Sequence, residues 1–283
     1  PRVSAWLLSY DLPGFSTGID TPPEAAIIVI AVFYAIAAIF NLNIPDTGAR
    51  YPKQQTNPLT LVSDFWHCVE TLWKDKLGQI SLAVTTLFWG AGATLQLMVL
   101  EWGKAHLGLR LDQASMLMGV ASVGTIVGAI VAGRYMTLKN ALTVLPFGIA
   151  MGFAVMFMPV THAMPVVCAL LILVGGLGGF FVVPMNALLQ HRGHVLLSAG
   201  HSIAVQNFNE QLNILLMVAI YSVMLSFQFS INMIIVLFGG FVAAMMVLIM
   251  QWNRVNHRRD PELDRLIGAE KSESAPHFLD RPH

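Results

Sequence analysis

The chain has 283 residues, of which 55% are hydrophobic and only 11% are charged, and its formal net charge is zero. A typical soluble domain carries roughly 25% charged residues, so this composition excludes an ordinary soluble domain and predicts an all-α, polytopic membrane protein. It also excludes nucleic acid as a partner, because nucleic-acid binding requires a basic surface. The two cysteines, Cys68 and Cys168, have no spacing that indicates a disulfide or a zinc site, and we expect free thiols.

The chain begins with a connector and a membrane span. Residues 1–22 are rich in Pro, Gly, Ser and Thr, which predicts a loop. Residues 23–44 contain the run A-A-I-I-V-I-A-V-F-Y-A-I-A-A-I-F, whose length suits a bilayer core, and Pro45 ends it. Because the chain starts at Pro1 with neither an initiator Met nor a signal-peptide pattern, we expect a fragment of a longer protein.

Residues 45–78 form a predicted connector that contains an amphipathic helix. Its apolar residues recur at helical spacing, and they are Leu59, Val62, Phe65, Trp66, Val69, Leu72 and Trp73. The opposite face is polar and carries Asp64, His67, Glu70, Lys74 and Asp75. Two placements fit this pattern equally well: a helix in the membrane interface with its tryptophans at headgroup level, or a surface helix packed on the protein.

Six further apolar runs predict a carboxyl-terminal six-helix domain over residues 79–253. The expected spans are residues 79–100, 113–133, 140–158, 165–188, 198–227 and 228–252. Runs of roughly 20 to 28 residues suit tilted membrane helices. Residues 254–283 are polar and charged, which predicts a soluble tail.

The distribution of Lys and Arg predicts the orientation of the chain. One alternate set of connectors is rich in these residues and carries Arg50, Lys53, Lys74, Lys76, Arg134, Lys139, Arg192, Arg254, Arg258 and Arg259. The other set carries only Arg2, Lys104 and Arg110. Because basic loops stay on the cytoplasmic side, we expect seven spans, a periplasmic amino terminus and connector 1–22, and a cytoplasmic connector 45–78 and tail.

A polar stripe on the predicted helix over residues 198–227 is the first candidate functional site. Gln206, Asn209, Glu210 and Asn213 fall on one helical face, with Asn207 and Gln211 on its flank. A carboxylate near the middle of a span is costly in lipid, so Glu210 should face a protein interior or a wet cavity. Polar residues of other spans are Gln96, Asn186 and Gln190. The predicted substrate-binding set is Glu210, Gln206, Asn207, Asn209, Asn213, Gln96 and Asn186. Interhelical hydrogen bonding is the favoured explanation for Gln96, Asn186 or Gln190 taken singly, whereas together with the Glu210 stripe they could line a shared polar pocket.

Glycines within the spans predict close helix packing or hinges. Those of the earlier spans are Gly90, Gly92, Gly119, Gly124, Gly128 and Gly133. A second group in L-V-G-G-L-G-G-F-F-V-V-P comprises Gly175, Gly176, Gly178, Gly179 and Pro184. Small residues let helix backbones approach closely in lipid, whereas Pro184, like Pro146, is expected to bend its helix. No strand precedes the second group, so it does not indicate phosphate binding.

Motifs for enzymatic chemistry are missing from the sequence. His191, His194 and His201 cluster in a predicted connector, but neither a carboxylate nor a cysteine joins them, which favours a solvated basic loop over a metal site. The sequence contains neither G-x-S-x-G nor H-E-x-x-H. We therefore expect no catalytic residues, no metal and no cofactor, and a protein that is not an enzyme.

Three runs between Leu82 and Ser222 are distinctive as a set, T-L-F-W-G-A-G-A-T-L (86–95), G-G-F-F-V-V-P-M-N-A-L-L-Q-H-R-G (178–193) and S-A-G-H-S-I-A-V-Q-N-F-N-E (198–210). Through these runs the stretch closely resembles the bacterial lysophospholipid transporter family of the major facilitator superfamily. The resemblance implies a twelve-helix fold of two six-helix halves with substrate between them. The chain would then supply the sixth helix and the carboxyl-terminal half, which are seven transmembrane helices of a truncated major facilitator fold.

The same resemblance implies the function and the place of two residues in it. The family moves lysophosphatidylethanolamine and related lysophospholipids across the bacterial inner membrane, for reacylation by a separate acyltransferase partner. Glu210 matches the acidic position in V-Q-N-x-x-E, where it would pair with a cationic headgroup or a basic residue. Gln96 stands where the family often has Arg, so a lipid phosphate would find only neutral hydrogen bonds there.

Three other functions are compatible with a polytopic helical protein. In a drug or metabolite proton antiporter of the same superfamily, Glu210 would carry the proton, and a pH gradient distinguishes this function from lysolipid flipping. A fused transporter and acyltransferase is disfavoured because the tail carries no acyltransferase motif. A channel is disfavoured because no ring of charges or filter of carbonyls is indicated.

Overall fold

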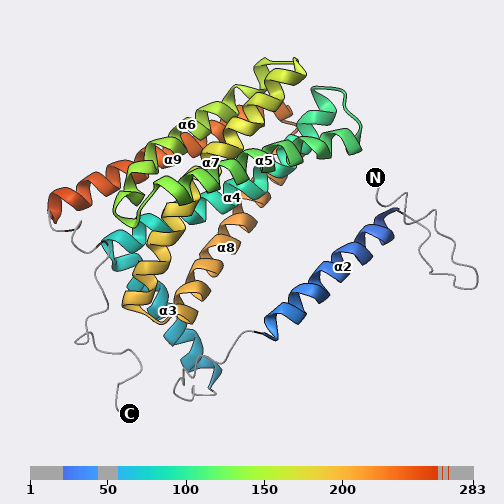
Figure 1. Cartoon of the computed structure of the whole chain (residues 1–283). Coiled ribbons are helices and arrows are strands. Elements are labelled where there is room, and N and C mark those ends of the chain that lie inside the picture. Colours follow the sequence, from blue (N-terminus) through green and yellow to red (C-terminus); the bar gives the residue numbers. More distant parts are fainter. Residues whose placement is uncertain (1–21, 44–56, 261–262, 264–266, 268–283) are drawn as a thin grey trace, which may run out of the picture. The chain divides into compact units, whose positions relative to one another are not determined.

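The computed structural model describes residues 22–43, 57–260, 263 and 267. Its elements in chain order are α2 (Pro22–Asn41), α3 (Pro58–Lys74), α4 (Lys76–Ala105), α5 (Leu111–Tyr135), η1 (Leu138–Val144), α6 (Leu145–Met156), η2 (Met158–Val160), α7 (Met164–Leu196), α8 (Ala199–Ser226) and α9 (Ile231–Arg259). The described residues form helices and turns without strands, which confirms the all-α prediction (Figure 1). Most of connector 1–22, the start of connector 45–78 and most of tail 254–283 lie outside the described residues.

The chain divides into two units, residues 1–54 and 55–283. In the first unit the structure describes α2, whose apolar part Ile27–Asn41 is shorter than the other apolar helices. In the second unit six helices, including the composite 138–160 segment, are long and apolar enough to cross a membrane. The second unit thus contains six candidate spans where the apolar runs predicted six, together with α3, and α2 of the first unit overlaps the predicted preceding span, residues 23–44.

The second unit is built from three closely packed helix pairs, α5 with α7, α6 with α9, and α4 with α8. Figure 1 shows α5 and α7 side by side. A Cβ on Gly124 or Gly128 of α5 would overlap the backbone of α7, and one on Gly175 or Gly179 would overlap the backbone of α5. These four glycines lie where the two backbones cross, as the packing interpretation requires.

The other predicted packing or hinge residues lie in different surroundings. A Cβ on Gly90 would overlap the Asn213 amide of α8, and one on Gly178 would lie 3.1 Å from the Phe88 ring. Gly92, Gly119 and Gly133 face open space, and Gly176 has a neighbour only at 3.6 Å. Pro184 is buried inside α7, which continues through it to Leu196.

Several helix boundaries differ from the apolar runs. Pro146 does not bend a helix interior, because it occupies the first turn of α6 after the 3-10 segment η1. The last two spans are separated by a turn in which Gln228 has a φ of 62°, and Ser230 caps α9. α7 continues past Leu188, so that His191 and His194 lie on a helix instead of in a loop. α9 likewise continues past Trp252 to Arg259, with basic residues in its last turn that suit the helix dipole.

The amphipathic helix α3 packs on the other helices of the second unit. Its buried residues Cys68, Val69 and Leu72 join a cluster completed by Leu82 of α4, Leu189 of α7, Val205 of α8 and Leu197. The Phe65 and Phe208 rings meet edge to face at 5.3 Å between centroids. One face of α3 is therefore part of the protein core.

Candidate functional site

The candidate site is centred on Glu210 of α8. Ser198 caps the start of this helix, and its hydroxyl oxygen accepts a hydrogen bond from the His201 N–H. Glu210 and Gln206 are both buried, one turn apart. The Gln206 amide donates to Glu210 Oε1 at 2.8 Å and to Asn186 Oδ1 of α7 at 3.0 Å. The predicted residues Glu210, Gln206 and Asn186 thus form one hydrogen-bonded cluster that joins α7 and α8, and we call it the Glu210 cluster.

Glu210 has no cationic partner among the residues that the structure describes. Its carboxylate accepts a hydrogen bond from the Gln206 amide, and a neutral amide compensates a buried carboxylate only in part. A carboxylate in this setting gains most from a proton or from a cation that arrives with a ligand or with another protein segment. The cluster is therefore chemically suited to transient binding of a positive charge.

The other two amides of the stripe point to different helices. Asn209 Oδ1 accepts a hydrogen bond from Trp73 Nε1 of α3 at 3.3 Å. Asn213 Nδ2 donates to the Thr86 carbonyl of α4 at 2.8 Å, beside Gly90. Both residues therefore hold α8 against its neighbours, and the structure does not join them to the Glu210 cluster.

Two predicted site residues are exposed on the second unit. Asn207 of α8 and Gln96 of α4 make no side-chain hydrogen bond to the Glu210 cluster among the described residues. Of the seven predicted substrate-binding residues, the structure brings together three, ties two to other helices and leaves these two at the surface.

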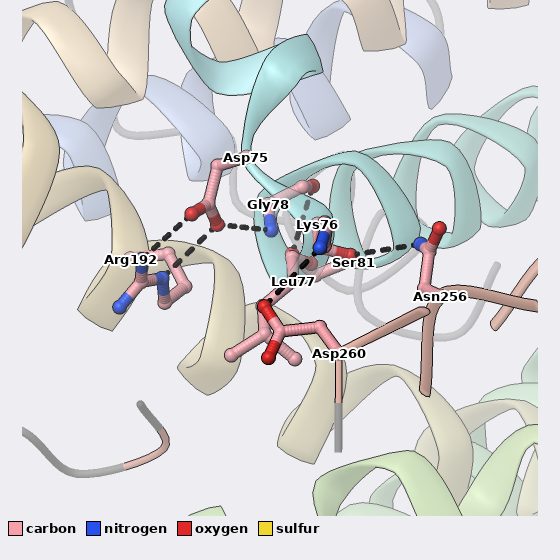
Figure 2. A network of polar contacts seen from close by, with 8 residues as sticks. All are labelled: Asp75, Lys76, Leu77, Gly78, Ser81, Arg192, Asn256 and Asp260. Carbon is pink, nitrogen blue, oxygen red and sulfur yellow. Dashed lines mark hydrogen bonds and ion pairs between the residues drawn. The ribbon is translucent and has the colours of Figure 1, made fainter. Parts of the chain in front are cut away.

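A second buried polar site, which the sequence analysis did not identify, lies where α3 meets α4. Asp75 separates the two helices, and its carboxylate accepts a hydrogen bond from the Gly78 N–H at 2.7 Å, capping α4. The Arg192 guanidinium of α7 binds the same carboxylate through two bonds, Nε to Oδ2 at 3.0 Å and Nη2 to Oδ1 at 2.6 Å (Figure 2). Only 5% of the Arg192 side chain and 12% of the Asp75 side chain is exposed.

The end of α9 extends this network. Lys76 Nζ pairs with Asp260 Oδ2 at 3.1 Å, and Asn256 Nδ2 donates to the Lys76 carbonyl at 3.3 Å (Figure 2). The sequence did carry a signal for the buried pair, because Arg192 is the only Lys, Arg, Asp or Glu in the 33 residues of α7. A lone charge at the end of such a helix needs a partner.

The predicted absence of a metal site concerns His191, His194 and His201. Among the described residues no group of three or more His, Cys, Asp or Glu side chains is arranged to hold a metal ion. His201 Nδ1 instead lies 2.6 Å from the Ser198 hydroxyl oxygen.

Comparison with known proteins identifies the superfamily. A sequence profile described as Major Facilitator Superfamily matches residues 3–212. The chain belongs to the major facilitator superfamily. Curated relatives named "Lysophospholipid transporter LplT" from Yersinia enterocolitica and Yersinia pestis are each 42% identical over 200 residues, which cover 70% of this chain and 49% of each relative. The chain thus spans about half the length of these curated relatives, and no solved structure matches it.

Membership of this superfamily fits the observed helices. The second unit supplies six candidate spans, the number in one half of the fold that the resemblance implied. The matched 200 residues carry the similarity to LplT well beyond the three short runs of the sequence analysis.

Proposed function

We propose that the protein is part of a transporter that moves lysophospholipids across the bacterial inner membrane by alternating access. The observation that carries this proposal is the 42% identity with proteins named as lysophospholipid transporters. The Glu210 cluster supports it, because the described residues place no cation beside this buried carboxylate, which makes it a suitable transient site for a headgroup ammonium, such as that of lysophosphatidylethanolamine.

The lipid phosphate would be recognised elsewhere than at Gln96. That side chain is exposed on α4 and offers neutral hydrogen bonds only. A cation for the phosphate would come from another part of the transporter, and the apolar acyl chain would stay close to lipid during the crossing.

A proton antiporter for drugs or metabolites is the second candidate function. It is favoured by the same feature of Glu210, since a buried carboxylate that lacks a cation is also suited to carry a proton. The two functions differ in energy source, because the antiporter must use a pH gradient.

The proposed orientation of the chain in the membrane follows from the connectors that are rich in Lys and Arg. We place the amino-terminal connector in the periplasm, α3 and the tail in the cytoplasm, and the acyltransferase, a separate partner, on the cytoplasmic side. We further propose that the protein transports its substrate chemically unchanged and is not an enzyme.

The test follows labelled lysophosphatidylethanolamine between the leaflets of liposomes that contain the full-length transporter, with and without a pH gradient. We expect lysolipid movement regardless of the gradient, and a loss of about tenfold or more in Glu210→Gln, because a charge-assisted hydrogen bond contributes about 1.5–3 kcal/mol. Glu101→Gln is the matched control, since Glu101 pairs with Lys104 at 2.8 Å outside the cluster. Lysolipid that stays in its leaflet would refute the proposed substrate, and transport that requires the gradient would favour the antiporter.

A further inference from the structure

The amphipathic helix α3 has an apolar arc that the rest of the protein covers only in part. At about 100° per residue, its apolar side chains cover roughly half of the helix circumference, from Cys68 round to Leu59. The other half is polar and carries Ser63, Asp64, His67, Glu70, Thr71 and Lys74. Such a clean division is typical of a helix that lies between an apolar and an aqueous phase.

The contacts with the protein come mainly from the carboxyl-terminal half of α3. Cys68, Val69 and Leu72 are buried against α4, α7 and α8, and Trp73 contacts α8 and α9. Nearer the start of the helix, Leu59 is 80% exposed, Val62 67% and Trp66 62%. These three residues form a continuous stripe, because positions i, i+3 and i+7 lie on one helical face. We call this stripe the outer face of α3.

The contacts of α3 fix the outer face at the end of the membrane spans. Trp73 stacks on Trp252 of α9, with 6.5 Å between ring centroids and 12° between planes. Directly after Trp252, α9 changes from apolar residues to a basic end with Arg254, Arg258 and Arg259. This change from apolar to basic residues marks the level of the lipid headgroups, where tryptophans are also enriched.

We propose that the outer face of α3 is a lipid-contacting surface that lies in the headgroup and acyl boundary of the membrane. Trp66 and Trp73 then sit at headgroup depth, Leu59 and Val62 reach the upper acyl region, and the polar half of the helix faces water. The basic end of α9 lies on the same side of the second unit as the carboxyl end of α3 and is complementary to anionic lipid headgroups, while Lys74 is paired with Glu70 at 2.6 Å.

In this arrangement α3 contacts the protein core, lipid and water, each through a different set of side chains. The protein core holds Cys68, Val69 and Leu72, while the Asp75–Arg192 ion pair and the Trp73–Asn209 hydrogen bond fix the rotation of the helix. Rotation of α3 away from lipid would break these contacts. The proposal is independent of the substrate that the transporter carries.

The experiment places one spin label at a time on the full-length protein in nanodiscs of phosphatidylethanolamine and phosphatidylglycerol. Cys68→Ala and Cys168→Ala remove the two thiols of this chain, and cysteines elsewhere in the full-length protein are likewise replaced by Ala. The labels are attached in Val62→Cys and in Ser63→Cys. These neighbours lie about 100° apart on the helix, so they form a matched pair on the outer face and the polar half. Collision with oxygen, which concentrates in lipid, is compared with collision with a water-soluble nickel complex.

We expect the ratio of oxygen to nickel collisions to be several-fold higher at position 62 than at position 63. Leu59→Cys repeats the measurement on the outer face if the Val62 variant does not fold. Equal ratios at the two positions would overturn the proposal, because the outer face would then lie in water. A label at position 62 that is immobilised and shielded from both reagents would also overturn it, because protein would then cover the outer face.

Discussion

Replacing Arg192 by Gln should loosen α3 and the start of α4 from the rest of the protein. The substitution removes both bonds between the guanidinium and the Asp75 carboxylate, and it leaves a largely buried charge without its cation. Removing one partner of a buried ion pair costs about 3–5 kcal/mol. Asp75 keeps its hydrogen bond from the Gly78 N–H, so we take the lower end of this range. A cost of about 3 kcal/mol raises the opening equilibrium roughly 100-fold.

The Cys68 thiol reports this opening directly. Cys68 is fully buried in the cluster between α3, α4, α7 and α8, so α3 must separate from its neighbours before a reagent can reach the sulfur. Burial, together with the charge of Asp64, raises the pKa of the thiol above its ordinary value, which keeps it protonated and unreactive in the closed state. In a background in which Cys168 and every other cysteine except Cys68 are replaced by Ala, the labelling rate of Cys68 is proportional to the opening equilibrium when reclosure is fast. We expect labelling to be roughly 100-fold faster in Arg192→Gln.

The exposed pair Lys76–Asp260 supplies the control. Its side chains are 39% and 36% exposed, and such surface pairs contribute about 0–1 kcal/mol. Asp260→Asn should therefore change the labelling rate by less than about fivefold. If Arg192→Gln labels no faster than Asp260→Asn, the buried ion pair does not hold α3 in place and the reasoning is wrong.

Two further predictions concern packing and pH. Gly128→Ala should destabilise the contact of α5 with α7 by about 1–3 kcal/mol in a thermal-unfolding measurement, because the new Cβ overlaps the Gly176 carbonyl. Gly119 faces open space, so Gly119→Ala should be neutral or stabilising in the same measurement. The raised thiol pKa predicts that Cys68 stabilises the folded protein fully below its ordinary pKa of 9.0, and that this contribution is lost as the pH rises through the higher folded value. Above pH 9 the midpoint temperature of thermal unfolding should therefore fall more steeply with rising pH for the parent than for Cys68→Ala. Parallel plots of midpoint temperature against pH would contradict this prediction.

Local patterns in the sequence predict the helices but do not predict which helices pack against one another. The apolar runs predict six of the spans because span length and hydropathy are properties of one segment. Helical periodicity likewise predicts that Gln206, Asn209 and Asn213 share a face of α8. It does not predict that this face meets α7 at Gln206, α3 at Asn209 and α4 at Asn213, since those contacts depend on how the helices pack. Asp75 and Arg192, 117 residues apart, were missed for the same reason.

Asp75 and Glu210 are both largely buried, but only Asp75 has a cationic partner among the described residues. This difference indicates a structural role for Asp75 and a functional role for Glu210. Asp75 has a bidentate guanidinium and a helix N–H, so its charge is satisfied within the folded protein. Glu210 has an amide donor from its own helix and no cation among the described residues. A transporter needs a site whose charge is compensated only when the substrate or a moving segment arrives, because a permanently paired group would bind neither. Arg192→Gln should therefore act mainly on stability, whereas Glu210→Gln, which removes an uncompensated charge, should act on transport and leave the fold intact.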